Sequence, residues 1–391
     1  MTDPIGVWLI GARGAVATTA QVGLAALARG DAPTTGLVTE MPPFNGLPLV
    51  PWDGLLVGGH EITGGSLQES AKLLERGHVL PTSLAASVAD DLAANDARIR
   101  PGVTTTTEPR VAIEQLKADL VAFREQHHLQ RVVVVLLAST EPAVAVDALP
   151  DRWADLDRSL SSDACPLLAS SLYAIAALEL GQPFVNFTPS LGASCPAIEE
   201  LAVDQGAPHA GRDGKTGETL LKTVLAPMFA ARHLEVMSWV GHNLLGNEDG
   251  RTLDDPANKA TKVDSKEAVL GETLGYQPQS HVSIEYIRSL GDWKTAWDHV
   301  HFRGFLQTPM TLQFTWQGCD SALAAPLVLD LVRLVNHAAE QGAAGALTEF
   351  CSFFKSPVGE APHAFFEQFC LLRDYAASAH ERATASASVK S

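Results

Sequence analysis

The order of elements at the start of the chain constrains its fold more than any other feature. Residues 5–10, IGVWLI, form an unbroken apolar run that indicates a buried strand, and Gly11 ends it. Apolar positions in residues 17–30 then recur at helical spacing. A short apolar stretch at residues 36–38 predicts a second strand, which would complete a βαβ unit of about thirty residues, as at the start of a dinucleotide-binding domain.

The turn between the strand and the helix is a candidate pyrophosphate site, because bare backbone amides at a helix N-terminus can hold an anion. Arg13 fills the second glycine position of the G-x-G-x-x-G fingerprint, although Gly14 still allows close backbone approach. A tight turn that binds nothing is the alternative. The predicted cofactor-binding turn consists of Gly11, Ala12, Arg13, Gly14, Ala15 and Val16.

Two acidic residues, Glu40 and Glu61, are candidates for binding a ribose hydroxyl. An acidic residue at this place favours NAD over NADP, because a carboxylate repels the 2′-phosphate of NADP. Arg13 points weakly the other way. We expect NAD as the cofactor and include Glu61 in its site.

Strand and helix patterns alternate through the first half of the chain, which predicts parallel α/β architecture. Strands covered on both faces are expected at residues 131–137 and 183–187. The character of the sequence changes near Leu234, where a second domain with antiparallel strands at residues 280–287 and 310–316 is expected. The other predicted segments are helices at 67–76, 111–127, 172–180 and 322–338, a functional loop at 41–65, and a frayed Ala- and Ser-rich tail at 376–391.

Charge and cysteine content exclude several classes of protein. The 391 residues include 28 Lys and Arg against 45 Asp and Glu, a formal net charge of -17 that repels nucleic acid and anionic lipid. The five cysteines include no Cys-x-x-Cys pair, so neither a disulfide framework nor a zinc ribbon is indicated. The start lacks the features of a signal peptide, and no stretch approaches about 18 apolar residues. We expect a cytoplasmic protein that binds neither nucleic acid nor membrane.

A glycine-rich segment at residues 209–219, HAGRDGKTGET, is a second candidate for binding an anion. It is not a P-loop, because the template requires glycine where His209 stands. What remains is a turn that enters an amphipathic helix, with N-terminal amides and the Thr216 hydroxyl available to an anionic group. Simple helix capping is the alternative.

Lysines supply candidate cations for the same region. Lys259, Lys262 and Lys266 would share one face of a helix, where like charges cost a few tenths of a kcal/mol per pair unless an anion compensates. A solvated face balanced by neighbouring acidic residues is the alternative. Lys294 and Lys355 stand among aromatic residues, and burial there would lower their pKa values toward the range useful for proton transfer.

Several stretches together resemble the myo-inositol-1-phosphate synthase family, and their order is similar to that of its shorter, archaeal-type branch along almost the whole chain. They are LIGARGAVATTA, VGGHEI, LLASTEP, VNFTPS, HAGRDGKTGETLLKTVLAPMF, HNLLGNEDG, SKEAVL, GCDSALAAPLVLDL and FFKSP. The resemblance implies a homotetramer in which each chain has a Rossmann NAD-binding domain and an inserted α+β catalytic and tetramerisation domain. The implied divisions are residues 1–233, the insertion at 234–320, and a C-terminal return to the Rossmann domain at 321–391.

The resemblance also implies a redox-neutral, NAD-dependent reaction on a hexose 6-phosphate. C5 is oxidised, a C6 proton is abstracted, C6 closes onto the C1 aldehyde, and the hydride returns. Glucose 6-phosphate thereby becomes 1D-myo-inositol 3-phosphate. Each step needs cations that hold the phosphate and stabilise oxyanions in a site closed to water.

The match to the family implies a set of site residues. The catalytic residues are Lys262, Lys266, Lys294, Lys355, Asp213 and Asp320, with Lys266 and Lys294 nearer the phosphate and Lys262 and Lys355 nearer the C5 and C1 oxygens. The substrate-binding residues are Thr216, Gly217, Asn243, Asn247 and Asp249. Beyond the turn, the cofactor-binding residues are Glu61, Ser139, Thr140, Asn186, Thr188 and Asp213. Some members use a divalent metal and others a monovalent cation, and no metal ligand is assigned.

Three alternatives stay open. A homologous cyclase could take fructose 6-phosphate in carbocyclic natural-product biosynthesis, with the same chemistry on another sugar. An ordinary NAD-dependent sugar-phosphate dehydrogenase would release NADH. A non-catalytic NAD-sensing protein is the third, and the complete set of four matching lysines argues against it.

Overall fold

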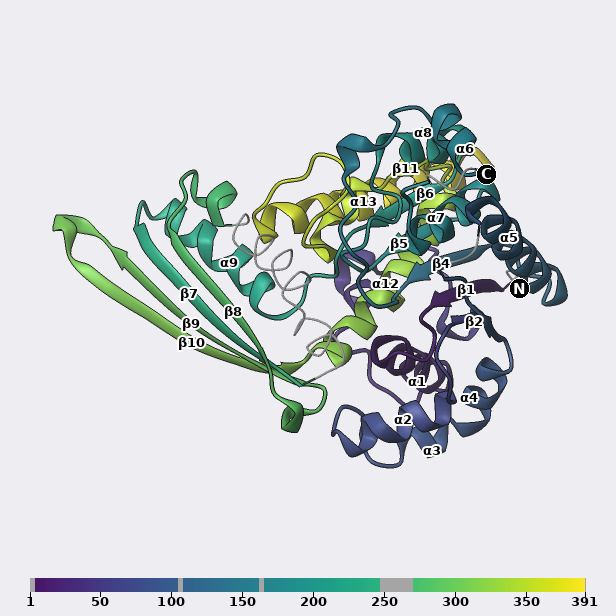
Figure 1. The fold of residues 1–391 in the computed structure, drawn as a ribbon, viewed down its shortest axis with the longest axis horizontal. Coiled ribbons are helices and arrows are strands. Elements are labelled where there is room, and N and C mark those ends of the chain that lie inside the picture. Colours follow the sequence, from purple (N-terminus) through teal and green to yellow (C-terminus); the bar gives the residue numbers. More distant parts are fainter. Residues whose placement is uncertain (1–3, 105–107, 162–164, 247–269, 391) are drawn as a thin grey trace.

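A wholly parallel sheet occupies one end of the computed structural model, and a separate four-stranded sheet extends from it (Figure 1). The structure describes residues 4–104, 108–161, 165–246 and 270–390. The parallel sheet has the order β11-β6-β5-β4-β1-β2-β3, so the chain starts in the middle and winds to both sides, as in a Rossmann fold. Its strands are β1 (Ile5–Ile10), β2 (Leu55–Glu61), β3 (Ile99–Pro101), β4 (Val132–Leu136), β5 (Phe184–Asn186), β6 (Pro208–Gly211) and β11 (Gly345–Ala346).

Helices cover both faces of this sheet, which explains why β1 and β4 are apolar throughout. Side chains alternate between the faces: Val7 and Leu9 of β1 belong to one buried cluster, and Trp8 and Ile10 belong to the other. The first face is covered by α1 (Ala15–Arg29), α12 (Asp320–Glu340) and α13 (Phe365–Lys390). The second is covered by α5 (Pro109–Gln126), α6 (Trp153–Ser159), α7 (Ala169–Glu179) and α8 (Pro196–Asp204).

Three shorter helices extend the first face near β3. They are α2 (Leu67–Arg76), α3 (Leu84–Ser87) and α4 (Ala89–Asp96), and they share a third buried cluster with α1. A capping box begins α2: the Ser66 hydroxyl accepts from the Glu69 amide, and the Glu69 side chain accepts in return from the Ser66 amide. The 3-10 turns are η1 (Val38–Glu40), η2 (Pro42–Phe44), η3 (Trp52–Gly54), η4 (Val146–Ala148), η5 (Arg288–Leu290), η6 (Phe305–Gln307) and η7 (Thr348–Phe353).

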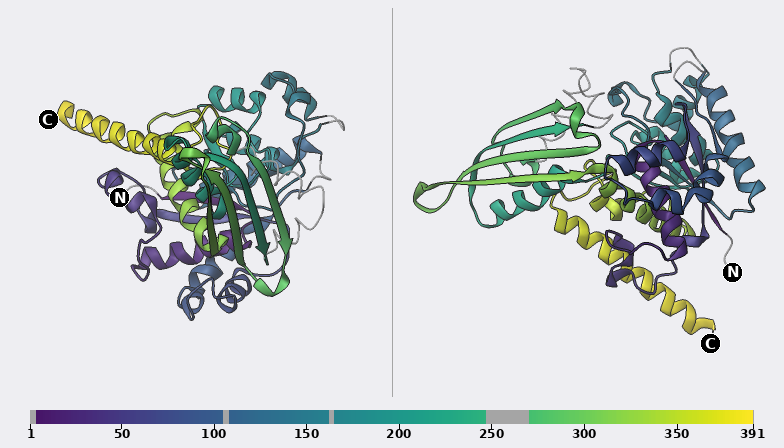
Figure 2. Two further views of the ribbon diagram at one scale, coloured as in Figure 1. Left: turned by 90° about the vertical axis from the view of Figure 1, so that its left-hand side faces the viewer. Right: turned by 90° about the horizontal axis from the view of Figure 1, so that it is seen from below.

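The second sheet is mixed and has one covered face. Its strands are β7 (Glu235–Leu245), β8 (Gln279–Tyr286), β9 (Trp293–Arg303) and β10 (Pro309–Cys319), in the order β10-β9-β7-β8. Helix α9 (Gly217–Ala231) lies against this sheet, where Phe229 packs with Trp239 and Val300. Figure 2 shows that α13 begins near the junction of the two sheets and runs away from the second one.

The predicted fold class is confirmed, since a parallel sheet of Rossmann order is joined to a separate mixed sheet. The divisions after residues 233 and 320 stay a prediction. The strands of the second sheet run from Glu235 to Cys319, and α9, which precedes them in the chain, packs on the same sheet.

Residues 36–38 do not form the predicted second strand. Val38–Glu40 is the turn η1, and the second strand is β2, inside the segment that we expected to be a loop. Asp330 of α12 supplies the reason, because its carboxylate accepts hydrogen bonds from the backbone amides of Val38 (2.6 Å) and Thr39 (3.0 Å). These amides therefore bond to a helix and not to a neighbouring strand.

Two further expectations were wrong in part. β10 is antiparallel to β9 as expected, but β8 pairs in parallel with β7. Alternation of apolar and polar residues marks a strand without fixing its direction, and the long connection from β7 to β8 allows a crossover. The tail does not fray from Ala376, because α13 continues to Lys390 and both Ala376 and Ala379 are buried in the core.

Helix α12 is long and apolar enough, by length and composition alone, to cross a membrane, although Asp330 and Arg333 interrupt its apolar run. It is the one helix in the described part of the chain that passes this test by length and composition. Most of it is buried inside the molecule, including the polar residues Asp330, Asn336 and His337. It is a core helix of the first face, packed against α1, β4 and β6.

Candidate active site

At Gly11, the turn that joins β1 to α1 has room for backbone only. Gly11 has a φ of 81°, and a Cβ there would lie 2.9 Å from the Cα of Ala138, just beyond β4. Gly14 is the N-cap of α1, no side chain caps this end, and the first turn has no acidic residue. The first amides of α1, which have no acceptor within the helix, therefore suit an anion at the switch point between β1 and β4.

Glu61, at the end of β2, lies against this turn, whereas Glu40 does not. One oxygen of Glu61 accepts from the backbone amide of Arg13 (2.9 Å), and the other accepts from the amides of the two residues that follow Glu61. Glu40 instead accepts from Arg333 of α12 (2.6 Å). The Arg13 side chain turns to Asp96, with Nε 2.9 Å from Oδ1.

The predicted cofactor residues after β4 and β5 lie at the same edge of the sheet. Ser139 is exposed and Thr140 is half-buried. Asn186 and Thr188 are buried and bond each other: Asn186 Oδ1 accepts from the Thr188 amide (3.0 Å) and hydroxyl (2.8 Å). The Asn186 amide group donates to the Ser190 carbonyl (2.7 Å), so these side chains shape the loop after β5. Their contacts with a cofactor stay predictions.

Asp213 and Lys355 meet although 142 positions separate them in the chain. Residues 211–215 follow β6 and run beside residues 353–358, joined by backbone hydrogen bonds of 2.6 to 3.2 Å. This pairing places Lys355 Nζ 2.9 Å from Asp213 Oδ1, with the side chains 17% and 12% exposed. The return of the C-terminal segment to the parallel sheet therefore brings an ammonium group to the end of β6.

Asp320 connects Thr216 to Lys294. The Thr216 hydroxyl, at the N-cap of α9, donates to Asp320 Oδ1 at 3.2 Å, and Lys294 Nζ of β9 lies 3.4 Å from Oδ2. Gly217 has a φ of 58° and packs on the Trp316 ring, where a Cβ would lie 3.3 Å from the ring. Asp213 and Thr216 are only three residues apart, at most about 11 Å, so both ion pairs belong to one region.

Lys215 is a buried lysine that the sequence analysis did not assign. Its ammonium group bonds the side chain of Gln368 and lies 5.9 Å from the ring centre of Phe365, both on α13. Burial lowers the pKa of Lys215 to about 8, with Cys351 raising it and Lys355 lowering it further. The position of Lys215 in the Gly-Lys-Thr run could have identified it as a candidate, but we considered this run only as a possible P-loop.

The structure thus brings together Asp213, Lys355, Thr216, Gly217, Lys294 and Asp320. Asn243 is fully buried in β7, with Nδ2 3.4 Å from the Ser283 carbonyl. Four predicted residues lie outside the described part of the chain: Lys262, Lys266, Asn247 and Asp249. Their roles stay predictions, as does the contribution of Lys259.

A third ion pair, which the sequence analysis missed, lies in the first turns of α9. Glu218 Oε1 is 2.7 Å from Lys222 Nζ, and each side chain is 1% exposed. Asp298 is buried beside them and accepts from Trp239 Nε1 at 2.7 Å. A Cβ at Gly241 would lie 2.7 Å from Glu218 Oε1 and 3.2 Å from Asp298 Oδ1, so the strand has room for glycine only.

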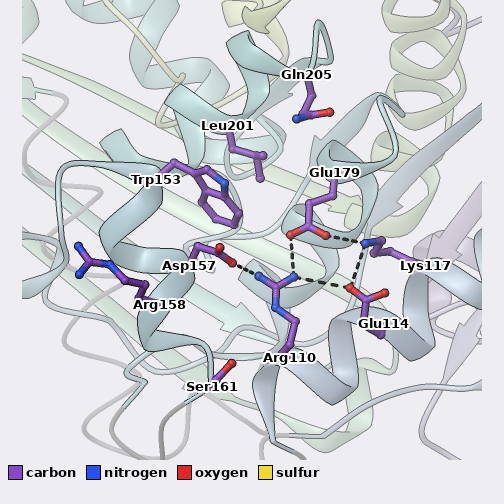
Figure 3. A pocket seen from close by; sticks show the side chains of 10 residues that line it. All are labelled: Arg110, Glu114, Lys117, Trp153, Asp157, Arg158, Ser161, Glu179, Leu201 and Gln205. Atoms are coloured by element: carbon purple, nitrogen blue, oxygen red, sulfur yellow. Dashed lines mark hydrogen bonds and ion pairs between the residues drawn. The ribbon is translucent and has the colours of Figure 1, made fainter.

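A cavity of about 700 Å³ on the outside of α5 to α8 is separate from these residues (Figure 3). Most of its charged groups are paired with one another: Arg110 with Asp157 and Glu179, and Lys117 with Glu114 and Glu179. None of the predicted site residues lines it. Over the described ranges, no three His, Cys, Asp or Glu side chains are grouped so that they could hold a metal ion.

The fold and the site define a dinucleotide-binding protein of the Rossmann class with lysine–aspartate pairs at the carboxyl edge of its sheet. A family model of NAD-binding proteins, described as Myo-inositol-1-phosphate synthase, matches residues 5–376, and the chain belongs to this family.

Relatives and solved structures agree with this placement. The chain is 33% identical to inositol-3-phosphate synthase 1 of Bacteroides thetaiotaomicron, over 93% of the chain and 91% of the relative. It is 30% identical to inositol-3-phosphate synthase 1 of Oryza sativa subsp. japonica, over 75% of the chain but only 62% of that longer protein. The fold is similar to inositol-3-phosphate synthase of Caenorhabditis elegans, with a TM-score of 0.84 and 22% identity over 97% of this chain and 86% of the other. It is also similar to a myo-inositol-1-phosphate synthase-related protein of Thermotoga maritima, with a TM-score of 0.78 and 22% identity over 96% and 98% of the two chains.

Proposed function

We propose that the chain is an NAD-dependent, redox-neutral cyclase that converts glucose 6-phosphate to 1D-myo-inositol 3-phosphate. The observation that carries the proposal is the pair of Lys355 and Asp213, assembled from distant parts of the chain at the carboxyl edge of a Rossmann sheet. Family membership supports the reaction class. NAD supplies the capacity to take a hydride from the sugar and to return it.

The residues that bind the cofactor in this proposal lie at the ends of four strands, β1, β2, β4 and β5. The amides at Gly14 to Val16 hold the pyrophosphate, and Glu61 binds a ribose hydroxyl. Gly11 supports this assignment, because any side chain there would collide with Ala138. Ser139, Thr140, Asn186 and Thr188 line the edge beyond β4 and β5.

The phosphate of the substrate binds at the start of α9. Thr216 and Gly217 precede a helix of 15 residues whose N-terminal amides attract an anion. Lys294 stands 3.4 Å from Asp320, which holds the ammonium group beside Thr216. Lys266, by the family match, acts at the same phosphate.

Lys355 and Lys262 act on the sugar oxygens. Lys355 Nζ donates to the oxygen that becomes negative during enolisation and aldol closure, and Asp213 keeps the ammonium group in place. The two residues are mostly buried, so charge in the site is weakly screened. Asn243, Asn247 and Asp249 form the wall of the sugar site. A divalent metal or a monovalent cation, if bound there, would supply further positive charge at the enolate oxygen, and we assign no ligand to it.

We also propose that the chain works as a homotetramer in the cytoplasm. The face of the second sheet that carries Trp297 supports self-association, because this ring is stacked on His242 at the surface. At the hairpin between β9 and β10, Phe305 and Leu306 are 88% and 79% exposed. Apolar groups exposed in this way are typical of a contact with another molecule. Light scattering on the purified chain, with F305S/L306S for comparison, measures the assembly.

The purified full chain, incubated with NAD and glucose 6-phosphate, should yield a cyclic phosphate ester without accumulating NADH. Phosphorus NMR identifies the ester, and absorbance at the reduced-nicotinamide wavelength follows NADH. A parallel reaction with fructose 6-phosphate tests the alternative sugar. Stoichiometric NADH would instead identify an ordinary dehydrogenase, and a chain that forms no ester from either sugar would refute the proposal. Assays with a chelator and with different monovalent salts test the cation.

A further inference from the structure

We propose that Asp96 sets the preference for NAD over NADP by holding the Arg13 side chain in an ion pair, so that it cannot receive a 2′-phosphate. The inference rests on the proposed function, since it presupposes that the turn after β1 binds a dinucleotide. It concerns a residue on α4, which lies outside that turn.

Arg13 lies between two carboxylates that bind different parts of it. Its backbone amide donates to Glu61 Oε2 at 2.9 Å, and its Nε lies 2.9 Å from Asp96 Oδ1. The side chains of Arg13 and Asp96 are 18% and 22% exposed, so solvent screens this pair only partly. Asp96 Oδ1 also accepts from the amide of Leu67, the first residue of α2, at 3.2 Å. The start of α2 thus fixes Asp96, and Asp96 fixes the guanidinium.

Both chemical determinants of dinucleotide choice meet at this point. An acidic residue after the second strand binds the ribose hydroxyl of NAD, and a nearby arginine accommodates the 2′-phosphate of NADP. Glu61 provides the first and Arg13 the second, and the two residues are in contact. A 2′-phosphate would be repelled by the Glu61 carboxylate, so its binding would require a neighbouring cation. Asp96 neutralises that cation, and the three side chains together carry a formal charge of about -1 at neutral pH.

Asp96→Asn is the direct test, because asparagine keeps an oxygen for the Leu67 amide while it removes the charge that holds Arg13. We expect NADP affinity to rise about 10- to 100-fold, the effect of one charge-assisted hydrogen bond, while NAD affinity is unchanged. Calorimetric titration of the full chain with NAD and NADP measures both dissociation constants. AMP and 2′-phospho-AMP serve as smaller probes of the ribose end alone. Asp96→Ser, which also keeps an acceptor for Leu67, is measured in case asparagine disturbs the fold.

Asp91 offers a matched control on the same helix. It pairs with Arg29 near the other end of α1, so Asp91→Asn also removes one charge from an arginine–aspartate contact between α1 and α4. We expect this variant to leave the NADP and NAD affinities unchanged. The double variant R13A/D96N tests the mechanism, because the gain in NADP affinity should disappear without the guanidinium.

The outcomes separate the inference from the proposed function. If wild-type chain binds NAD but neither Asp96 variant binds NADP more tightly, the role of Asp96 is refuted. A gain that persists in R13A/D96N would mean that loss of negative charge alone is responsible, which also refutes the proposed hold on Arg13. If the wild-type chain binds neither dinucleotide, the proposed function itself fails.

Discussion

Two ion pairs of different kinds lie near the start of α9. At the entrance to α9, Thr216 bonds Asp320, which pairs with Lys294 at 3.4 Å, and these side chains are partly open to solvent. Just inside the helix, Glu218 pairs with Lys222 at 2.7 Å, and both side chains are almost fully buried. The same residue types therefore serve two purposes, and their access to solvent distinguishes them.

The solvent exposure of each ion pair indicates whether its lysine is available for chemistry. A buried pair gains strong attraction but costs several kcal/mol of desolvation per ion, so its geometry must be kept intact for the fold. A partly exposed pair can release its lysine to a ligand at little cost to stability. Substitutions at the two places should therefore separate activity from stability.

Replacing Lys222 with Met should reduce the free energy of unfolding by about 3–5 kcal/mol, because Glu218 would stay buried without its cation. Chemical denaturation monitored by tryptophan fluorescence measures the change. The double variant E218L/K222M should recover part of this loss, since it removes the charges of Glu218 and Lys222 together while Asp298 stays buried beside them. A double variant that is no more stable than K222M would contradict the interpretation of this contact as a compensated buried pair.

Replacing Lys355 with Met should lower kcat by about 10²- to 10³-fold, the usual cost of losing one oxyanion donor. Stability should change far less than in K222M, because the Lys355–Asp213 pair is more open than the Glu218–Lys222 pair. Initial-rate assays and denaturation of the same preparation measure both quantities. Lys117→Met is the control: this lysine also pairs with carboxylates, but it lines the separate cavity on α5 to α8. Equal losses of kcat in both variants would contradict the assignment.

The sequence was sufficient to predict the Rossmann sheet and to name Asp213, Asp320 and two lysines as candidate site residues, although it did not predict which of them pair. The apolar strand, Gly11 and the helix that follows form a local pattern that needs no distant contact. The family match then placed Asp213 and Lys355 in one site although they are far apart in the chain. Asp320 and Lys294 were placed in the same way.

The errors share a physical cause, since each depended on contacts that a local pattern does not contain. Residues 36–38 have strand composition, but Asp330 of α12 binds the amide of Val38 from a helix that is distant in the chain. Alternation in residues 280–287 identified β8 but not its direction. Glu218 and Lys222 have the spacing of an ordinary surface pair, and only the packing of β7 and β9 on α9 buries them.

Replacing Lys294 with Met should raise KM for the hexose phosphate about 10- to 100-fold, while kcat changes less than in K355M. The reason is that Lys294 stands beside Thr216 and Asp320 at the start of α9, where we place the phosphate. Steady-state kinetics separates the two constants. Stability should fall by about 1 kcal/mol or less, because the contact is long and partly exposed. A fall in kcat with unchanged KM would move Lys294 from the phosphate to the reacting carbons.

His60 is a buried histidine whose surroundings favour the neutral ring. Its effect on the free energy of unfolding is the smallest that we predict. Its Nδ1 accepts from Trp8 Nε1 at 2.9 Å, and its Nε2 faces Asp119 at 3.1 Å. Burial lowers the pKa of His60 below 6.5, although Asp119 acts in the opposite direction and Arg100 adds to the lowering. Above 6.5 the ring is neutral in both the folded and the unfolded chain.

As the pH falls through 6.5, the unfolded chain takes up a proton that the folded chain does not, so His60 makes the free energy of unfolding decrease until its folded pKa is reached. The chain has 13 histidines, so the slope is measured as a difference between wild type and His60→Asn. Asparagine does not titrate, and its carbonyl can still accept from Trp8. Urea midpoints between about pH 5 and 8 should fall more steeply for the wild type toward acid. Parallel curves would show that His60 takes up its proton equally in both states, which would contradict the lowering of its pKa by burial.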